Sequence, residues 1–169
     1  MTPRDTGRAQ MYAAERIVHR MFDHAGSAAN GRMVELAGAR VTLPSEASFA
    51  SVESVADYVT RVLTLPAVSE EFARAALPVR VRRRRGHRSA EYRRTPDGAE
   101  IAVPTSAEGR WALRELVVLH EIAHHLDDST DASHGRGFVI TLIELVGRVM
   151  GPEAAFVYRV VFADSGVGA

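Results

Sequence analysis

The segment His120–His124 constrains the fold of this chain more than any other part of it. It reads His-Glu-Ile-Ala-His and lies inside an apolar stretch with the spacing of a helix. Residues four apart on a helix are separated by about 40° around the axis and about 6 Å along it, so both imidazole rings project from one face. Glu121 lies about 100° around the helix from His120 and stays near that face. The segment therefore predicts a buried helix with two histidines aimed at one point.

Two histidines in this arrangement, with a glutamate between them, are typical of a zinc-binding helix. A catalytic zinc ion takes three protein ligands and keeps one open position, so the third ligand must come from outside this turn. His125 points away from the metal face, and we expect it to support or cap the helix. The polar segment after the helix should turn the chain back, which makes His134 the expected third ligand. Glu144 remains an alternative, as do the aspartates of the turn (Asp127, Asp128 and Asp131).

This site predicts a hydrolytic mechanism in which zinc lowers the pKa of a bound water molecule. Glu121 would take the proton from that water as the general base, and hydroxide would attack a carbonyl group. Asp127 and Asp131 are candidates to orient a ligand histidine. Tyr92 and Arg136 are candidates to stabilise the developing oxyanion or to contact the substrate. The predicted function is a zinc-dependent hydrolase, most simply a metallopeptidase acting on a peptide or protein.

The spacing of the motif also resembles a known family. His120-Glu121-x-x-His124, followed after nine residues by His134-Gly135-x-x-Phe138, is similar to the motif of SprT-like zinc metalloproteases. In that family the three histidines bind zinc and the glutamate is the catalytic base, and the resemblance implies the same roles here. It further implies a zincin-like minimal metalloprotease fold. The chain contains no cysteine, so it lacks the cysteine-rich zinc ribbon that many of these proteases carry.

A second resemblance extends over most of the chain. Arg4-Asp5, the segment Tyr12–Glu15, the arginine-rich strand and the motif helix are similar to a group of small actinobacterial metallohydrolases. This resemblance implies a metal-dependent hydrolase and points to no particular substrate.

Composition and length indicate one globular domain. The chain has 169 residues, of which 46% are hydrophobic and 25% are charged. This balance is typical of a folded protein, and the absence of cysteine excludes disulfide bonds and thiolate metal sites. We expect a single α+β domain over residues 1–169. Its parts would be an N-terminal helix and strands (1–78), an arginine-rich β-meander (79–104) and the zinc-site helices (105–165).

Hydrophobic periodicity and turn residues predict the individual elements. Helices are expected over residues 4–25, 51–64, 68–76, 106–127, 135–150 and 153–163. Thr105 and Glu108 fit a capping box at the start of the helix over 106–127. Residues 32–43 should form strands around Gly38, and the segment 79–103 should form a small antiparallel sheet. The strand within 99–104 would offer an edge to which an extended peptide could add.

The formal net charge of zero conceals a basic segment. From Arg74 to Arg94 the chain has nine arginines against one acid, Glu91, a net charge of +8, and it has no lysine anywhere. Such a segment indicates an anionic partner. Beside a zinc site it would favour an acidic substrate. The alternatives to a hydrolase are a nucleic-acid-binding module that uses this segment and an inactive protein in which zinc braces the fold.

The sequence predicts a cytoplasmic protein without a membrane partner. Its apolar stretches, Trp111–Leu119 and Phe138–Met150, are interrupted by charged residues and are shorter than a bilayer span. The N-terminal residues include no continuous apolar stretch of the kind that a secretory signal needs.

Overall fold

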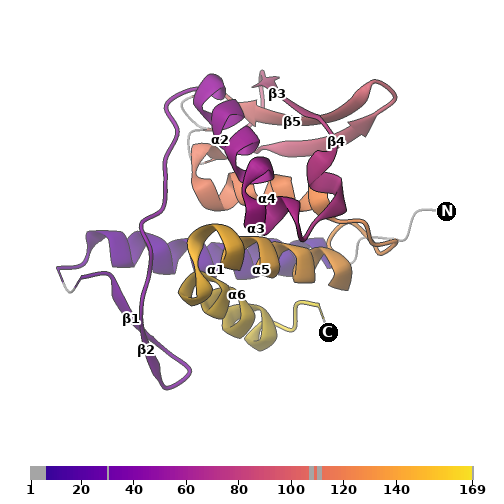
Figure 1. The fold of residues 1–169 in the computed structure, drawn as a ribbon. Coiled ribbons are helices and arrows are strands. Elements are labelled where there is room, and N and C mark those ends of the chain that lie inside the picture. The colour runs from indigo at the N-terminus through magenta and orange to yellow at the C-terminus, as the bar shows by residue number, and fades with distance from the viewer. Residues whose placement is uncertain (1–6, 30, 107–108, 110–111, 169) are drawn as a thin grey trace. The chain divides into compact units, whose positions relative to one another are not determined.

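The computed structural model describes residues 7–29, 31–106, 109 and 112–168, which form an α+β structure of helices and two small sheets (Figure 1). The chain divides into two compact units. The first combines the N-terminal residues up to Ser45 with the residues from Ser129 onwards, and the second runs from Glu46 to Asp128. No helix in the described part of the chain is long and apolar enough to cross a lipid bilayer.

The first unit is built on helix packing. Its elements are α1 (Arg8–Ser27), β1 (Met33–Leu36), β2 (Ala39–Thr42), α5 (Arg136–Met150) and α6 (Pro152–Asp164). Helix α6 packs against both α1 and α5. The large apolar side chains buried in this unit include Met11, Phe22, Phe138, Leu142, Leu145, Tyr158 and Phe162. Gly151, with a φ of 108°, makes the turn between α5 and α6 that an L-residue would adopt only with strain.

Strands β1 and β2 form an antiparallel hairpin, which confirms the strands predicted around Gly38. Ala37 and Gly38 have φ angles of 50° and 75°, so both residues of the two-residue turn are left-handed, as a twisted hairpin requires. Arg32 closes the open end of the hairpin. Its Nε donates to the carbonyl of Leu43 at 3.1 Å, and its Nη2 donates to that of Pro44 at 2.9 Å.

The second unit places two helices against a three-stranded sheet. Its elements are α2 (Val52–Thr64), α3 (Pro66–Ser69), the 3-10 helix η1 (Ala73–Ala76), β3 (Val79–Arg84), β4 (Glu91–Thr95), β5 (Gly98–Pro104) and α4 (Glu115–Leu126). Helix α2 contacts β3, and α4 contacts β4 and β5. Ile101, Ala102 and Val103 in β5 are fully or almost fully buried, so the middle of the sheet belongs to the core.

The sheet order differs from the predicted meander. The strands are arranged β3-β5-β4, with β5 antiparallel to β4 and parallel to β3. An apolar strand is most stable between two neighbours, whereas the arginine-rich strands β3 and β4 tolerate the solvent-exposed edges. The expectation that residues 99–104 offer a free edge is therefore wrong, because β5 is paired on both sides.

Helix α4 begins later than predicted. The sequence favoured a helix over 106–127, but α4 starts at Glu115, and Arg114 is extended with φ and ψ of −103° and 151°. The segment before the helix pairs instead with a distant part of the chain. Phe49 donates its N–H to the carbonyl of Leu113 at 2.8 Å, and Ser48 forms a β-bridge with Arg114. Because Arg114 takes part in this backbone pairing, it is extended rather than helical, and the helix begins after it.

The predicted capping box does not start α4. Thr105 precedes the helix by ten positions, and Glu108 lies outside the described residues. The other helices agree better with their predicted ranges: α1, α2, α5 and α6 are confirmed within a few residues at each end. The helix expected over 68–76 is divided into the short α3 and η1.

Carboxylates anchor the N-terminal end of α4. Glu115 is buried, and its Oε1 accepts a hydrogen bond from the hydroxyl of Tyr58 at 2.5 Å. Its Oε2 accepts from the backbone N–H of Ala47 at 2.8 Å. Burial and the neighbouring carboxylate raise the pKa of Tyr58 far above its usual value, so the hydroxyl remains a donor. Glu115 thus ties α4 to α2 and to the segment that precedes it.

A second carboxylate acts at the same end of the helix. Arg114 donates from Nε and Nη2 to the two carboxylate oxygens of Glu46, at 2.7 and 2.6 Å. Glu46 Oε1 also accepts the backbone N–H of Leu116 at 3.2 Å. A carboxylate that accepts from the first turn of a helix satisfies an otherwise unpaired N–H group and complements the helix dipole.

We predict that Tyr58→Phe lowers the free energy of unfolding by about 1–3 kcal/mol, because it leaves a buried carboxylate oxygen without its donor. Urea denaturation followed by circular dichroism measures the change. Thr64→Val on the same helix is the matched control, since it removes an exposed hydroxyl that donates to Thr60 and Arg61 carbonyls. Equal losses in the two variants would contradict the anchoring role of Glu115.

Candidate metal centre

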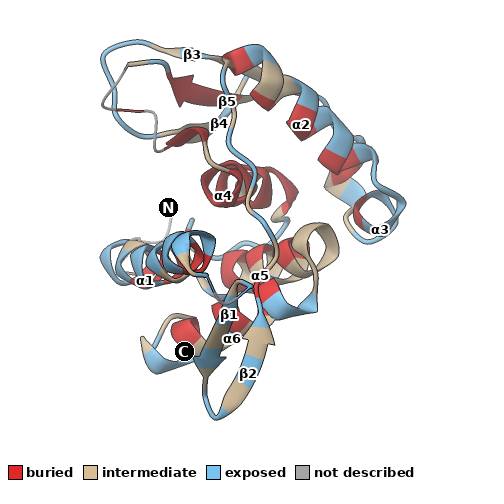
Figure 2. Ribbon diagram, turned by 90° about the vertical axis from the view of Figure 1, so that its left-hand side faces the viewer, coloured by how far each residue is buried: buried red, intermediate tan, exposed pale blue. Residues whose placement is uncertain are grey.

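The motif His120–His124 lies in α4, and this helix is almost completely buried. Every residue from Glu115 to Leu126 is buried except His124, which is half-buried (Figure 2). His120 and Glu121 are therefore buried polar groups. Burying such groups is costly unless they are bonded to a partner or a metal ion, so their position indicates a specific role.

The two histidines of the helix converge as their spacing predicts. Their Nε2 atoms are 3.1 Å apart, and the ring centroids are 4.8 Å apart with the planes at 74°. Two nitrogen ligands of a tetrahedral zinc ion, each about 2.0–2.1 Å from the metal, are about 3.3 Å from each other. The observed separation of His120 and His124 is close to this value.

His134 lies directly before α5 and is buried. Its ring lies beside those of Tyr12 and Phe138, at centroid distances of 5.3 and 5.2 Å. The N–H of Gly135 donates to the carbonyl of Ala132 at 2.8 Å, which closes a turn around His134. Aromatic packing and this turn together hold the imidazole in place.

His120, His124 and His134 form a group that could hold a metal ion. Each offers one ring nitrogen, and these three atoms lie within 4.8 Å of one another. Three neutral imidazoles suit zinc and several other transition metals, and three protein ligands leave a position for water or substrate. The donor set therefore fits the metal that the sequence predicted.

Two of the alternative acidic ligands, Glu144 and Asp131, bind other groups of the protein through their carboxylates. Glu144 Oε1 accepts from Nε and Nη2 of Arg148, at 3.1 and 2.7 Å, on the surface of α5. Asp131 Oδ2 accepts the N–H of Gly137 at 2.8 Å and so stabilises the first turn of that helix. Asp127 ends α4, where its own N–H donates to the carbonyl of Ala123 at 2.8 Å. Among the described residues, the metal-binding group contains none of these carboxylates.

Tyr92 belongs to the surroundings of the helix histidines. Its ring lies nearly parallel to that of His124, with the planes at 9° and the centroids 6.3 Å apart. Its hydroxyl lies 3.3 Å from Nδ1 of His125. The residue thus contacts both neighbouring histidines from β4. Arg136, the other candidate for the oxyanion, is an exposed residue at the start of α5.

His125 links α4 to two other segments of the second unit; the sequence predicted a supporting role for it but not these partners. Its Nε2 lies 3.0 Å from the carbonyl of Leu77, which can only accept a hydrogen bond. Burial lowers the pKa of His125, and the nearby arginines act in the same direction. A neutral ring that donates from Nε2 must accept at Nδ1, so the hydroxyl of Tyr92 is the donor there. His125 therefore joins α4 to the chain before β3.

Two arginines of the basic segment cap the C-terminal end of α4. Arg74 Nε donates to the carbonyl of His125 at 2.7 Å, and Arg94 Nη2 donates to that of Asp127 at 2.9 Å. Arg94 Nε also lies 3.4 Å from the hydroxyl of Tyr92. Positive groups at this end of a helix satisfy free carbonyls and complement the helix dipole. Sequence patterns could not reveal the two carbonyl contacts, because Arg74 and Arg94 lie 51 and 33 positions from the residues whose carbonyls they bind.

Most remaining arginines of the segment form ion pairs on the sheet. Glu100 is bridged by Arg80 and Arg82, at 3.2 and 2.8 Å. Hydrogen bonds from these two guanidinium groups lower the pKa of the Glu100 carboxyl. The other pairs are Arg84–Glu91, Arg93–Glu91 and Arg83–Glu53. Arg85 and Arg88, in the exposed turn between β3 and β4, make no ion pair with the part of the chain that the structure describes.

Comparisons with known proteins identify no relative: no family model, curated protein or solved structure matches the chain. The functional conclusions therefore rest on the geometry of the histidines and their surroundings.

We predict that Arg74→Gln lowers the free energy of unfolding by about 1–2 kcal/mol, because it removes a charged donor from the last turn of α4. Arg80→Gln is the matched control: the side chain of Arg80 is 76% exposed, and its ion pair should contribute less than about 1 kcal/mol. Urea denaturation of both variants tests the difference. A larger effect at Arg80 would show that the basic segment acts mainly through its surface pairs.

Proposed function

We propose that the protein is a zinc-dependent hydrolase whose substrate is a peptide or another amide. The observation that carries this proposal is the pair His120 and His124 on the buried helix α4, with Nε2 atoms 3.1 Å apart and Glu121 between them in the sequence. The third histidine of the group, His134, supplies the ligand count of a catalytic rather than a structural zinc site. The resemblance to SprT-like metalloproteases and the zincin-like fold that it implies belong to the same proposal.

Zinc is the metal we favour for this donor set. Imidazole nitrogen is a common zinc ligand, whereas a calcium or magnesium site needs oxygen ligands. When bound, zinc supplies Lewis acidity, which acidifies water and polarises a carbonyl oxygen. Everything else in the reaction falls to side chains of this protein.

Glu121 is the proposed general base. It follows His120 on α4 and is buried, so its carboxylate is shielded from bulk solvent. It would take a proton from the attacking water and later give it to the leaving amine. Tyr92 would hold the ring of His124 through their parallel contact, rather than act on the substrate through its hydroxyl, which His125 and Arg94 engage.

Strand β4 offers a place for an extended peptide. It pairs with β5 on one side, and no described strand pairs with its other side. Tyr92 of this strand contacts His124, so a peptide added along β4 would lie near the metal-binding histidines. Arg93 on the same strand is half exposed beyond its pair with Glu91, which would favour an acidic substrate.

Nucleic-acid binding is the second candidate, and the exposed Arg85 and Arg88 are the observation that favours it. It is weaker because five other arginines of the segment are paired with carboxylates. Such binding would fall steeply with salt concentration and would survive loss of the histidines. Fluorescence anisotropy with labelled DNA at rising salt separates this function from the hydrolase.

We predict that the gently purified protein contains about one zinc ion per chain, and that His124→Ala removes it because one of three ligands is lost. Inductively coupled plasma mass spectrometry measures the metal. His87→Ala, at an exposed histidine of the β3–β4 turn, is the matched control and should keep the zinc. A wild-type protein that neither contains zinc nor binds it on titration would disprove the proposal.

We predict that Glu121→Gln keeps the zinc but lowers peptide hydrolysis by a factor of about 10²–10⁴, the usual contribution of a general base. A fluorescent peptide library, with acidic and basic members, provides the assay. Glu144→Gln serves as the control for loss of a carboxylate elsewhere. If Glu121→Gln retains the wild-type rate, or if no member is cleaved by either protein, the zinc would only brace the fold.

A further inference from the structure

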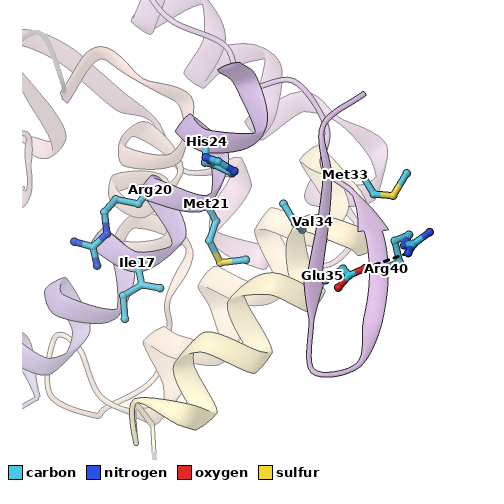
Figure 3. A pocket seen from close by; sticks show the side chains of 8 residues that line it. All are labelled: Ile17, Arg20, Met21, His24, Met33, Val34, Glu35 and Arg40. Carbon is cyan, nitrogen blue, oxygen red and sulfur yellow. Dashed lines mark hydrogen bonds and ion pairs between the residues drawn. The ribbon is translucent and has the colours of Figure 1, made fainter. Parts of the chain in front are cut away.

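The first unit has a hollow between α1 and the β1–β2 hairpin, but its side chains do not meet at one point (Figure 3). The guanidinium of Arg20 and the side chain of Met33 point away from the space between helix and hairpin. The carboxylate of Glu35 is paired with Arg40 at 3.1 Å. Charged side chains gather instead on one face of the three-stranded sheet of the second unit.

The register of the strands defines two faces of this sheet. Residues paired across neighbouring strands project from the same face, and successive residues of one strand project from opposite faces. Tyr92 projects toward α4, because its hydroxyl lies 3.3 Å from Nδ1 of His125. Arg93, the next residue, pairs with Glu100 and therefore projects from the face away from α4.

The face away from α4 is positively charged. Within β3, β4 and β5 it carries four arginines against two glutamates, a net charge of +2: Arg80, Arg82, Arg84 and Arg93 with Glu91 and Glu100. The side chain of Arg93 is 55% exposed, whereas that of Arg84 is 15% exposed. Because β4 is an edge of the sheet, Arg93 is the arginine of this face that an added strand would meet first.

Arg93 can bind a new carboxylate without leaving Glu91 unpaired. Its Nε lies 3.2 Å from Glu91 Oε2, and Nη2 of Arg84 lies 2.7 Å from the same oxygen. When Arg93 turns to another anion, the closer and less exposed guanidinium of Arg84 still neutralises Glu91. A planar guanidinium also presents donors in several directions, so Arg93 can contact two carboxylates at once.

The neighbouring arginine of β4 has a different role. Arg94 projects toward α4, where its Nη2 donates to the carbonyl of Asp127 at 2.9 Å. Tyr92 on the same face contacts His124 and His125. A peptide added along β4 therefore meets an arginine already bound to the protein on one face and a half-exposed arginine on the other.

We propose that Arg93 selects a peptide substrate by one acidic side chain, which lies opposite it on the face away from α4. This inference rests on the proposed hydrolase function and on addition of the peptide to β4. Side chains of an extended peptide alternate between the two faces, so the residues on either side of the acid project toward α4. An acid at those two positions gains no pairing with Arg93.

A set of quenched fluorescent peptides, each with one glutamate at a different position of a neutral sequence, tests this selection. Mass spectrometry identifies the bond that is cut, and positions are counted from it. Glutamate should raise kcat/KM about threefold at one position and not at the two positions beside it, the usual effect of an opposite-charge pair across two strands. Lysine at that position should lower kcat/KM.

Matched variants assign the preference to Arg93. Arg93→Gln should remove it, and Arg93→Glu should reverse it, so that lysine is preferred at the same position. Arg80→Gln removes an arginine from the same face at the opposite edge of the sheet and should keep the preference for glutamate. A preference that the Arg93 variants leave unchanged, or that Arg80→Gln removes equally, would overturn the inference.

A binding measurement separates this inference from the proposed function. Fluorescence anisotropy records binding of the same peptides to Glu121→Gln, which should leave them almost uncut. Binding with the single-position preference, although the wild type cuts no peptide, would refute the hydrolase and support the Arg93 contact. Cleavage with glutamate equally favoured at adjacent positions would refute the Arg93 contact alone. Peptides neither bound nor cut would refute both.

Discussion

The structure of the second unit depends on how the buried helix α4 is held at its two ends. Carboxylates of Glu46 and Glu115 act at the N-terminal end, and guanidinium groups of Arg74 and Arg94 act at the C-terminal end. Each sign of charge meets the helix end of opposite partial charge. Helix α4 is buried on nearly all sides, so apolar packing alone would not define its rotation about its own axis or its position along that axis. These directional bonds fix its rotation, and with it the direction in which His120 and His124 point.

The arginine-rich segment acquires a different meaning from these contacts. Read as a run of charge, it indicates an anionic partner. In the fold, two of its arginines bind backbone carbonyls at the C-terminal end of α4, and five share the carboxylates of Glu53, Glu91 and Glu100. Arginine suits both tasks, because its planar group presents several donors in fixed directions. The charge of the segment is therefore in large part internal to the unit, and among its described arginines Arg85 and Arg88 in the exposed turn form no ion pair.

Local patterns predicted what depends on neighbouring residues and failed where distant segments meet. The helices α1, α2, α5 and α6, the Gly38 hairpin and the convergence of His120 with His124 follow from short-range spacing. The sheet order and the start of α4 do not, because they depend on pairing between β3 and β5 and on the bridge from Ser48 to Arg114. The hydrogen bond between His125 and Leu77 could not be predicted either, because the two residues are 48 positions apart and no sequence pattern relates them.

The order of strands in the sheet has a consequence for how the chain reaches this structure. β4 and β5 are joined by a two-residue turn, so their pairing closes a very short loop and costs little chain entropy. Strand β3 pairs with residues of β5 that lie 20 positions further along the chain, as Val79 does with Ala99, so this pairing closes a longer loop. Local hairpins form faster than such distant pairs. Tyr92, in β4, therefore belongs to the part of the sheet that forms first. Strand β5, which α4 contacts, pairs with β4 before it pairs with β3.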